Sequence, residues 1–174
     1  PPQSGVKHEI VIRPKMAFGT GHHATTYMMM AAMEGLHFNK AKVLDYGCGT
    51  GILAILAEKL GASLIDAVDI ELEAYENTLE HAELNKCYSI KPVHGILEDI
   101  KGEEYGIILA NINRNVILDS LQPLHKKLTP DGHLLVSGIL LKDRDLVAEK
   151  ATQTGFTLVK SEQRGDWCCL DFVR

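Results

Sequence analysis

The sequence predicts a doubly wound α/β fold, in which a mostly parallel sheet of seven strands ends in an antiparallel hairpin. Three observations lead to this prediction. From residue 42 onward, short apolar runs alternate with amphipathic segments of helical spacing, which is the pattern of parallel βαβ units. One run, residues 103–112, contains a continuous apolar stretch, as expected for a central parallel strand. The last two runs are joined by Gly165-Asp166, a hairpin signal.

The individual elements follow from the same patterns. The first strand, KVLDY, is a short apolar run ended by glycines, and the first core helix closes with Gly61. The next helix starts with Glu71 and Glu73, which the helix dipole favours in a first turn. The predicted strands are residues 42–46, 63–70, 89–95, 103–112, 133–139, 156–164 and 167–173. The predicted helices are residues 51–61, 71–85, 114–128 and 141–155, and residues 129–132 (TPDG) are predicted to be a turn.

An N-terminal stretch, residues 1–41, leads into this core. It contains a possible strand at 8–14, a glycine loop at 16–23 (MAFGTGHH) and a helix at 24–36. We therefore expect one domain overall, with residues 1–41 as an N-terminal segment that carries a loop and a helix, and residues 42–174 as the core.

Composition excludes several classes of protein. The 18 basic and 23 acidic residues among 174 give a net charge of −5, which argues against binding to nucleic acid through bulk charge. The sequence has no apolar run long enough to span a membrane and no signal-peptide pattern. The four cysteines form no C-x-x-C pair, so we expect reduced thiols, a cytoplasmic location and no metal site. His22-His23 lacks a third ligand at useful spacing.

The strongest motif is VLDYGCGTG, at the junction of the first core strand and helix. Gly47, Gly49 and Gly51 allow a tight turn and a close approach of the backbone to a ligand. Their G-x-G-x-G spacing matches neither the dinucleotide fingerprint G-x-G-x-x-G, because position 52 is Ile52, nor a P-loop. In an open α/β sheet, ligands bind outside the carboxyl ends of the strands.

The next strand ends in Asp69-Ile70. A carboxylate at this place accepts hydrogen bonds from both hydroxyls of a ribose, and Ile70 offers an apolar face to an adenine. Asp45, just before the glycines, is expected near a cationic end of the ligand. A ligand with a ribose and an adenine but no pyrophosphate is S-adenosyl-L-methionine. The alternative is that the glycines form only a turn and that Asp69 is only a solvated cap.

The motif DYGCGTG together with VDI resembles the class I S-adenosylmethionine-dependent methyltransferases, whose fold is Rossmann-like. Two further stretches, MAFGTGHHATT (16–26) and LANI (109–112), closely resemble the PrmA family of bacterial ribosomal protein methyltransferases. The resemblance runs from about Pro14 to Phe172 and includes GILLKDRD (138–145). It implies methylation of protein eleven of the large ribosomal subunit, at lysine side chains and the N-terminal amine.

Carried over residue by residue, the cofactor contacts of that family fall on Thr26, Gly47, Asp69 and Asn111, to which the motif analysis adds Gly49 and Ile70. The segment from Phe18 to Gly21 resembles the family's loop over the methionine part of the cofactor. Family members carry an N-terminal recognition domain, and this sequence begins just after the place where that domain would end. Gly95-Ile96 departs from the family pattern and leaves the contact with the adenine edge unassigned.

Methyl transfer from a sulfonium requires a positioned acceptor with a free lone pair. A nearby carboxylate would favour the charged ammonium form of a lysine, so a neutral acceptor suits the reaction better. We therefore assign Asn111 the catalytic role of positioning the acceptor amine or the methionine end of the cofactor, against the alternative that it only caps a strand.

Other functions are open at this point. The chain could methylate another protein or a small-molecule amine, or it could bind the cofactor without turnover. A nicotinamide enzyme fits the glycine spacing worst. The expected partner is a ribosomal protein of the large subunit, free or assembling, with no direct nucleic acid contact and no membrane; the sequence leaves the oligomeric state open.

Overall fold

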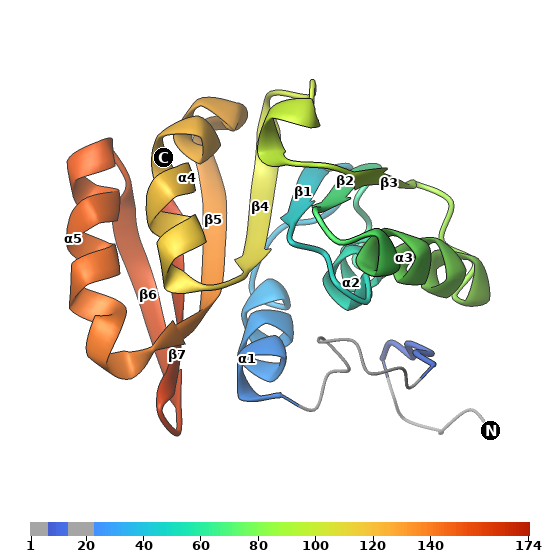
Figure 1. The fold of residues 1–174 in the computed structure, drawn as a ribbon, viewed down its shortest axis with the longest axis horizontal. Helices are drawn as coiled ribbons and strands as arrows, with labels where there is room; N and C mark the ends of the chain where they lie inside the picture. The colour runs from blue at the N-terminus through green and yellow to red at the C-terminus, as the bar shows by residue number, and fades with distance from the viewer. Residues whose placement is uncertain (1–6, 14–22) are drawn as a thin grey trace.

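The computed structural model describes residues 7–13 and 23–174, and it confirms the predicted fold class (Figure 1). A seven-stranded sheet has the strand order β3-β2-β1-β4-β5-β7-β6. Neighbours from β3 to β5 are parallel, and β7 is antiparallel to both β5 and β6. The strands are β1 (Lys42–Tyr46), β2 (Leu64–Asp69), β3 (Ile90–His94), β4 (Tyr105–Asn111), β5 (Leu128–Leu140), β6 (Thr157–Arg164) and β7 (Trp167–Val173).

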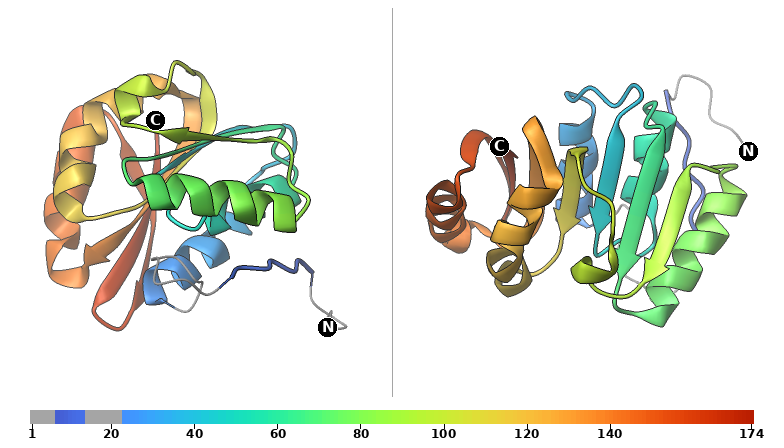
Figure 2. Two further views of the ribbon diagram at one scale, coloured as in Figure 1. Left: turned by 45° about the vertical axis from the view of Figure 1, so that its right-hand side comes forward. Right: turned by 90° about the horizontal axis from the view of Figure 1, so that it is seen from above.

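Helices cover both faces of the sheet (Figure 2). They are α1 (Ala24–Met33), α2 (Ile52–Lys59), α3 (Leu72–Leu84), α4 (Arg114–Lys127) and α5 (Arg144–Thr154), with short 3-10 turns η1 (Leu97–Asp99) and η2 (Leu141–Asp143). One apolar cluster lies between the sheet and α1 and α2, and a second lies under α4 and α5. Met28, Met29 and Met33 are buried in the first cluster, so the methionine run of α1 is core packing. No helix in the described ranges is long and apolar enough to cross a membrane.

Strand register brings the motif residues to one level. Tyr46 of β1 pairs with Val68 of β2 on one side and with Ala110 of β4 on the other. The residues that follow, Gly47, Asp69 and Asn111, therefore lie side by side at the carboxyl edge of three adjacent parallel strands. Figure 1 shows the arrowhead of β4 pointing toward α1, which lies at this edge.

The TPDG segment is not a separate turn between α4 and a strand, because it lies inside β5. The pairing of β4 with β5 jumps from Tyr105↔Leu128 to Ile107↔His133, so the segment bulges out of the ladder. Asp131 has φ 61°, as its turn chemistry predicts, and its backbone N–H donates to the carbonyl of Arg174 at 3.3 Å. The turn residues were identified correctly, but contacts with the C-terminus keep the segment within the sheet.

The possible strand at 8–14 is not formed in the part of it that is described. Residues 7–13 run extended without a strand partner. Their backbone is instead paired by side chains of α3 and of the residue after it: Asn85 exchanges two hydrogen bonds with Val11, both of 2.8 Å. The predicted strand was thus right in its extended conformation, but not in its pairing with a sheet.

Candidate functional site

The glycine loop is fixed by backbone bonds and by lack of space. Gly47, Gly49 and Gly51 have φ values of 74°, 55° and 77°, in the left-handed region. The N–H of Gly47 donates to the carbonyl of Val68 at 2.8 Å, which ties the loop to β2. A Cβ on Gly47 would lie 2.3 Å from the side chain of Ile112. Glycine at this position is thus required both by conformation and by the close approach of the loop after β4.

The carboxylate of Asp69 is held at the tip of β2 by two backbone N–H groups. Gly49 donates to Oδ2 at 2.9 Å and Glu71 donates to Oδ1 at 3.0 Å. Each carboxylate oxygen has a second lone pair, so this arrangement fixes the carboxylate while leaving capacity for two further donors. Ile70, the next residue, is 66% exposed. An exposed apolar side chain beside a fixed carboxylate suits a nucleoside, because the first can cover a base and the second can accept from ribose hydroxyls.

The structure brings Asn111 and Thr26 together. Asn111 Nδ2 donates to Thr26 Oγ1 at 3.3 Å, and Thr26, in α1, is fully buried. Asn111 Oδ1 is also buried, and it has no hydrogen-bond partner among the described residues. These two residues line a small cavity with Gly47, Cys48, Gly49, Ile52 and Leu53. A buried acceptor without a donor is costly unless a ligand or water supplies one.

All six residues that we assigned to the cofactor or to catalysis are therefore described, and they lie at one edge of the sheet. Thr26, Gly47, Gly49 and Asn111 share the cavity, Asp69 is bonded to Gly49, and Ile70 lies next to it on the exposed side. The segment Phe18 to Gly21, together with His22, lies outside the described residues.

Asp45, near the end of β1, is buried against the start of α2. Its Oδ2 accepts a hydrogen bond from the N–H of Ala54, in the first turn of α2, at 3.1 Å, and its Oδ1 has no partner among the described residues. Burial raises the pKa of this carboxyl from 3.8 to about 7; the charge of Asp69 adds to the rise, while the Ala54 hydrogen bond opposes it. The first role of Asp45 is thus to satisfy a free N–H at the start of α2.

Two residues of α3 form hydrogen bonds with the outer side of the glycine loop. We did not predict either of them from the sequence. Thr78 Oγ1 donates to the carbonyl of Gly49 at 3.3 Å, and His81 Nδ1 lies 2.7 Å from the carbonyl of Thr50. Both side chains are fully buried. Their spacing of three residues placed them on the inner face of a helix, which indicates packing but gives no sign of a contact with a loop.

His23 has a local structural role. Its Nδ1 accepts from the N–H of Thr25 at 3.3 Å and so caps α1, and its ring makes an edge contact with Trp167 at 5.2 Å between centroids. Within the described ranges, no three His, Cys, Asp or Glu side chains gather as a metal site would require.

Comparison with known proteins identifies the family. The family model described as "Ribosomal protein L11 methyltransferase (PrmA)" matches residues 2–174. A ribosomal protein L11 methyltransferase of Porphyromonas gingivalis is 42% identical over 99% of this chain and 60% of its own length. One from Acetivibrio thermocellus is 39% identical over 94% of this chain and 54% of its own length. The chain thus spans about 60% or less of the length of these relatives.

Solved structures agree with this. The crystal structure of a ribosomal protein L11 methylase from Lactobacillus delbrueckii subsp. bulgaricus is 33% identical, has a TM-score of 0.87 and covers 94% of this chain and 83% of that one. A methyltransferase from Pyrococcus furiosus shares the fold, with a TM-score of 0.77 at 15% identity, covering 94% of this chain and 88% of that one. With a family model that matches nearly every residue and relatives more than 30% identical, this chain belongs to the PrmA family of ribosomal protein L11 methyltransferases.

Proposed function

We propose that this chain binds S-adenosyl-L-methionine at the tips of β1, β2 and β4 and directs its methyl group to amines of ribosomal protein L11. The observation that carries the proposal is the level alignment of Gly47, Asp69 and Asn111 on three neighbouring parallel strands, in a chain of this family. The Asp69 carboxylate, which would accept from ribose hydroxyls, and the Asn111 amide oxygen, which lacks a donor among the described residues, then lie at the same edge of the sheet.

The residues fit such a cofactor in three respects. Asp69 is already fixed by two backbone donors and keeps lone pairs for two hydroxyls. Ile70 is exposed beside it, where it would cover an adenine face. Asn111 Oδ1 lacks a donor, which the ammonium of the methionine part would supply. When bound, the cofactor supplies an electrophilic methyl group on a sulfonium.

The residues of this chain must orient the substrate amine in its neutral form. Holding a lysine amine neutral at pH 7, when its ordinary pKa is about 10.4, costs about 4.6 kcal/mol. A free carboxylate beside the amine would add to that cost. Asp69 is engaged by backbone N–H groups and Asp45 is buried against α2, so the polar group that lines the cavity at the tip of β4 is the neutral amide of Asn111. An amide oxygen has two lone pairs, so Asn111 Oδ1 would accept one N–H from the ammonium of the cofactor and one from the substrate amine, without favouring protonation of that amine. This is the catalytic role that we propose for Asn111.

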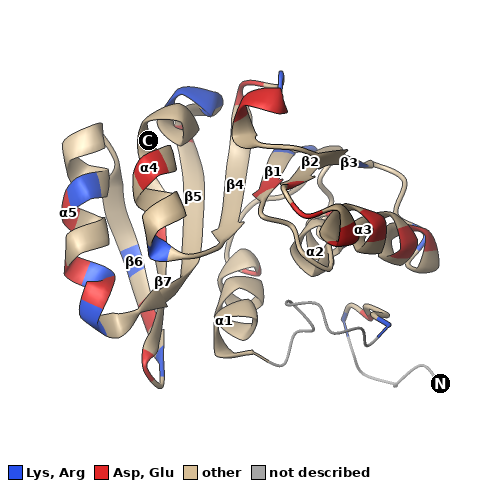
Figure 3. Ribbon diagram, viewed as in Figure 1, with Lys and Arg blue, Asp and Glu red and all other residues tan. Residues whose placement is uncertain are grey.

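Charge distribution supports a cationic protein substrate over a nucleic acid. Lys and Arg are scattered along the ribbon, whereas α3 and the residue before it carry a series of acidic side chains (Figure 3). They are Glu71, Glu73, Glu76, Glu80 and Glu83. The series begins next to Asp69, so its field favours the approach of amines and opposes that of phosphates.

We place the activity in the cytoplasm, where ribosomal proteins are made, with residues 42–174 as the methyltransferase core and residues 1–41 as its N-terminal segment.

Calorimetry followed by methyl transfer tests this proposal. The 174-residue chain is titrated with S-adenosylmethionine and, separately, with NADH; binding of the first alone is expected. Transfer of a tritiated methyl group to ribosomal protein L11 is then compared with transfer to a panel of other proteins and small amines. Preferential labelling of L11 supports the proposal, and labelling of another amine instead would favour the broader methyltransferase alternative. Binding without any transfer would identify a cofactor-binding module, and binding of NADH alone would overturn the proposal.

A further inference from the structure

His81 connects two segments that are far apart in the sequence. Its ring is fully buried, with Nδ1 2.7 Å from the carbonyl of Thr50 and Nε2 3.2 Å from the backbone N–H of Arg13. A carbonyl only accepts and a backbone N–H only donates, so the partners settle the tautomer: Nδ1 carries the proton and Nε2 accepts. The ring is thus neutral, and both of its nitrogens are used.

On the Thr50 side, His81 constrains the glycine loop. Together with Thr78, it ties the carbonyls of Thr50 and Gly49 to α3. Since two successive carbonyls are held toward α3, the loop cannot rotate these peptide groups without breaking buried hydrogen bonds. The peptide group before them is held separately, because the N–H of Gly49 donates to Asp69 at 2.9 Å, so three successive peptide groups of the loop are fixed.

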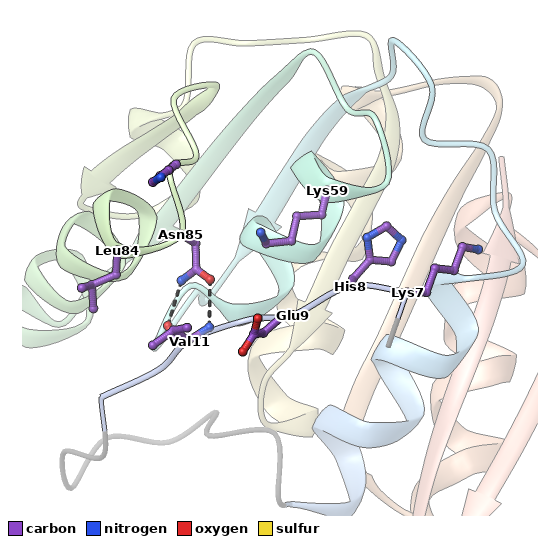
Figure 4. Close-up of a pocket in the computed structure, with 8 residues that line it drawn as sticks. Lys7, His8, Glu9, Val11, Lys59, Leu84 and Asn85 are labelled. Atoms are coloured by element: carbon purple, nitrogen blue, oxygen red, sulfur yellow. Dashed lines mark hydrogen bonds between the residues drawn. The ribbon is translucent and has the colours of Figure 1, made fainter. Parts of the chain in front are cut away.

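On the Arg13 side, His81 belongs to a set of contacts that hold the N-terminal strap, which we define as residues 7–13. Asn85, one helical turn after His81, pairs with both backbone groups of Val11 (Figure 4). The Arg13 guanidinium contacts the carboxylate of Glu80 at 2.6 Å. Figure 4 shows the strap running past the ends of α2 and α3, with Lys59 and Asn85 beside it.

We propose that His81 is a positioning residue for the cofactor: a hydrogen-bonded chain from Arg13 through the imidazole to Thr50 sets the glycine loop in its binding conformation. This inference rests on the proposed function, because the ligand is S-adenosylmethionine. It assigns the ring no contact with that ligand. What the loop requires is one donor and one acceptor at the two ring positions, rather than an imidazole as such.

Two substitutions separate this role from simple packing. His81→Gln keeps a donor and an acceptor on one side chain, whereas His81→Phe fills the space with neither. We expect Phe to weaken the affinity for S-adenosylmethionine about tenfold and Gln to stay within about threefold of the wild type. His133→Gln is the matched control, because His133 is a part-buried histidine paired with Asp171 toward the opposite end of the sheet.

The experiment measures the dissociation constant for S-adenosylmethionine by calorimetry, well below the melting temperature of each variant. Hydrogen exchange of the Gly51 N–H, which donates to the carbonyl of Cys48 at 2.8 Å, is followed in the ligand-free protein. Faster exchange and weaker binding in the Phe variant, with near-normal values for Gln and for His133→Gln, support the inference. Equal affinity and equal exchange in the Phe variant and the wild type would overturn it.

The two proposals fail in different ways. If the wild type does not bind S-adenosylmethionine, the proposed function is wrong, while exchange of the Gly51 N–H still tests whether His81 sets the loop. If His81→Phe does not fold, the Gln variant decides: affinity and exchange close to those of the wild type support the inference, and a tenfold loss of affinity with a normal circular dichroism spectrum contradicts it.

Discussion

Replacing Asp45 by Asn should remove a pH-dependent loss of stability. The pKa of Asp45 is raised from 3.8 to about 7 by burial, so the folded protein holds a proton that the unfolded chain releases between these values. Stability therefore falls as pH rises through this window, and the full penalty is present above pH 7. A shift of about three pKa units corresponds to about 4 kcal/mol. The asparagine is neutral at every pH, and its oxygen can still accept from the Ala54 N–H, at the place where Asp45 Oδ2 does so at 3.1 Å.

The assay is urea unfolding of both proteins at several pH values between 4 and 8. The difference in free energy of unfolding, variant minus wild type, should increase by about 4 kcal/mol across that range. Contributions from the other titrating groups cancel in this difference, because both proteins share them. A difference that stays constant with pH, or one that decreases toward pH 8, would show that burial does not raise the pKa of this carboxyl.

Three further substitutions test the site. Asp69→Ala should weaken S-adenosylmethionine binding about a hundredfold in calorimetry through the loss of two charge-assisted hydrogen bonds, whereas an unchanged affinity would remove Asp69 from the site. Asn111→Ala should reduce both cofactor affinity and methyl transfer, and unchanged values of both would leave Asn111 as a strand cap. Gly47→Ala should destabilise the fold by about 2–4 kcal/mol in urea unfolding, because φ is 74° and the new Cβ would meet Ile112 at 2.3 Å; a native-like midpoint would contradict that packing argument.

Sequence patterns predicted the core of the fold well because strands such as β1, β4 and β7 are mostly buried. The predicted strands at residues 42–46 and 167–173 have the bounds of β1 and β7. Such strands have mostly apolar sequences, and the ends of the apolar run indicate where the strand begins and ends. The TPDG segment shows the limit of this approach, since its local turn chemistry is real but contacts with Arg174 determine that it bulges within β5.

The candidate site was predictable only where it depends on motif spacing. The glycines and Asp69 follow from a loop and a strand end, and parallel topology alone brings them together. Thr26 came from family resemblance, because nothing in a helix of apolar and small residues indicates a bond to Asn111. His81 was missed for a related reason: its two partners, Thr50 and Arg13, are 31 and 68 residues away in the sequence. Helical periodicity indicates that such a side chain is buried, but not what it binds.

The most direct measurement is a crystal structure of this chain with S-adenosylmethionine or its demethylated product. We expect ligand density over the tips of β1, β2 and β4, with both ribose hydroxyls at hydrogen-bond distance from Asp69 and the amino-acid end beside Asn111. Clear density at any other place on the protein, or none at a concentration that saturates calorimetric binding, would contradict it.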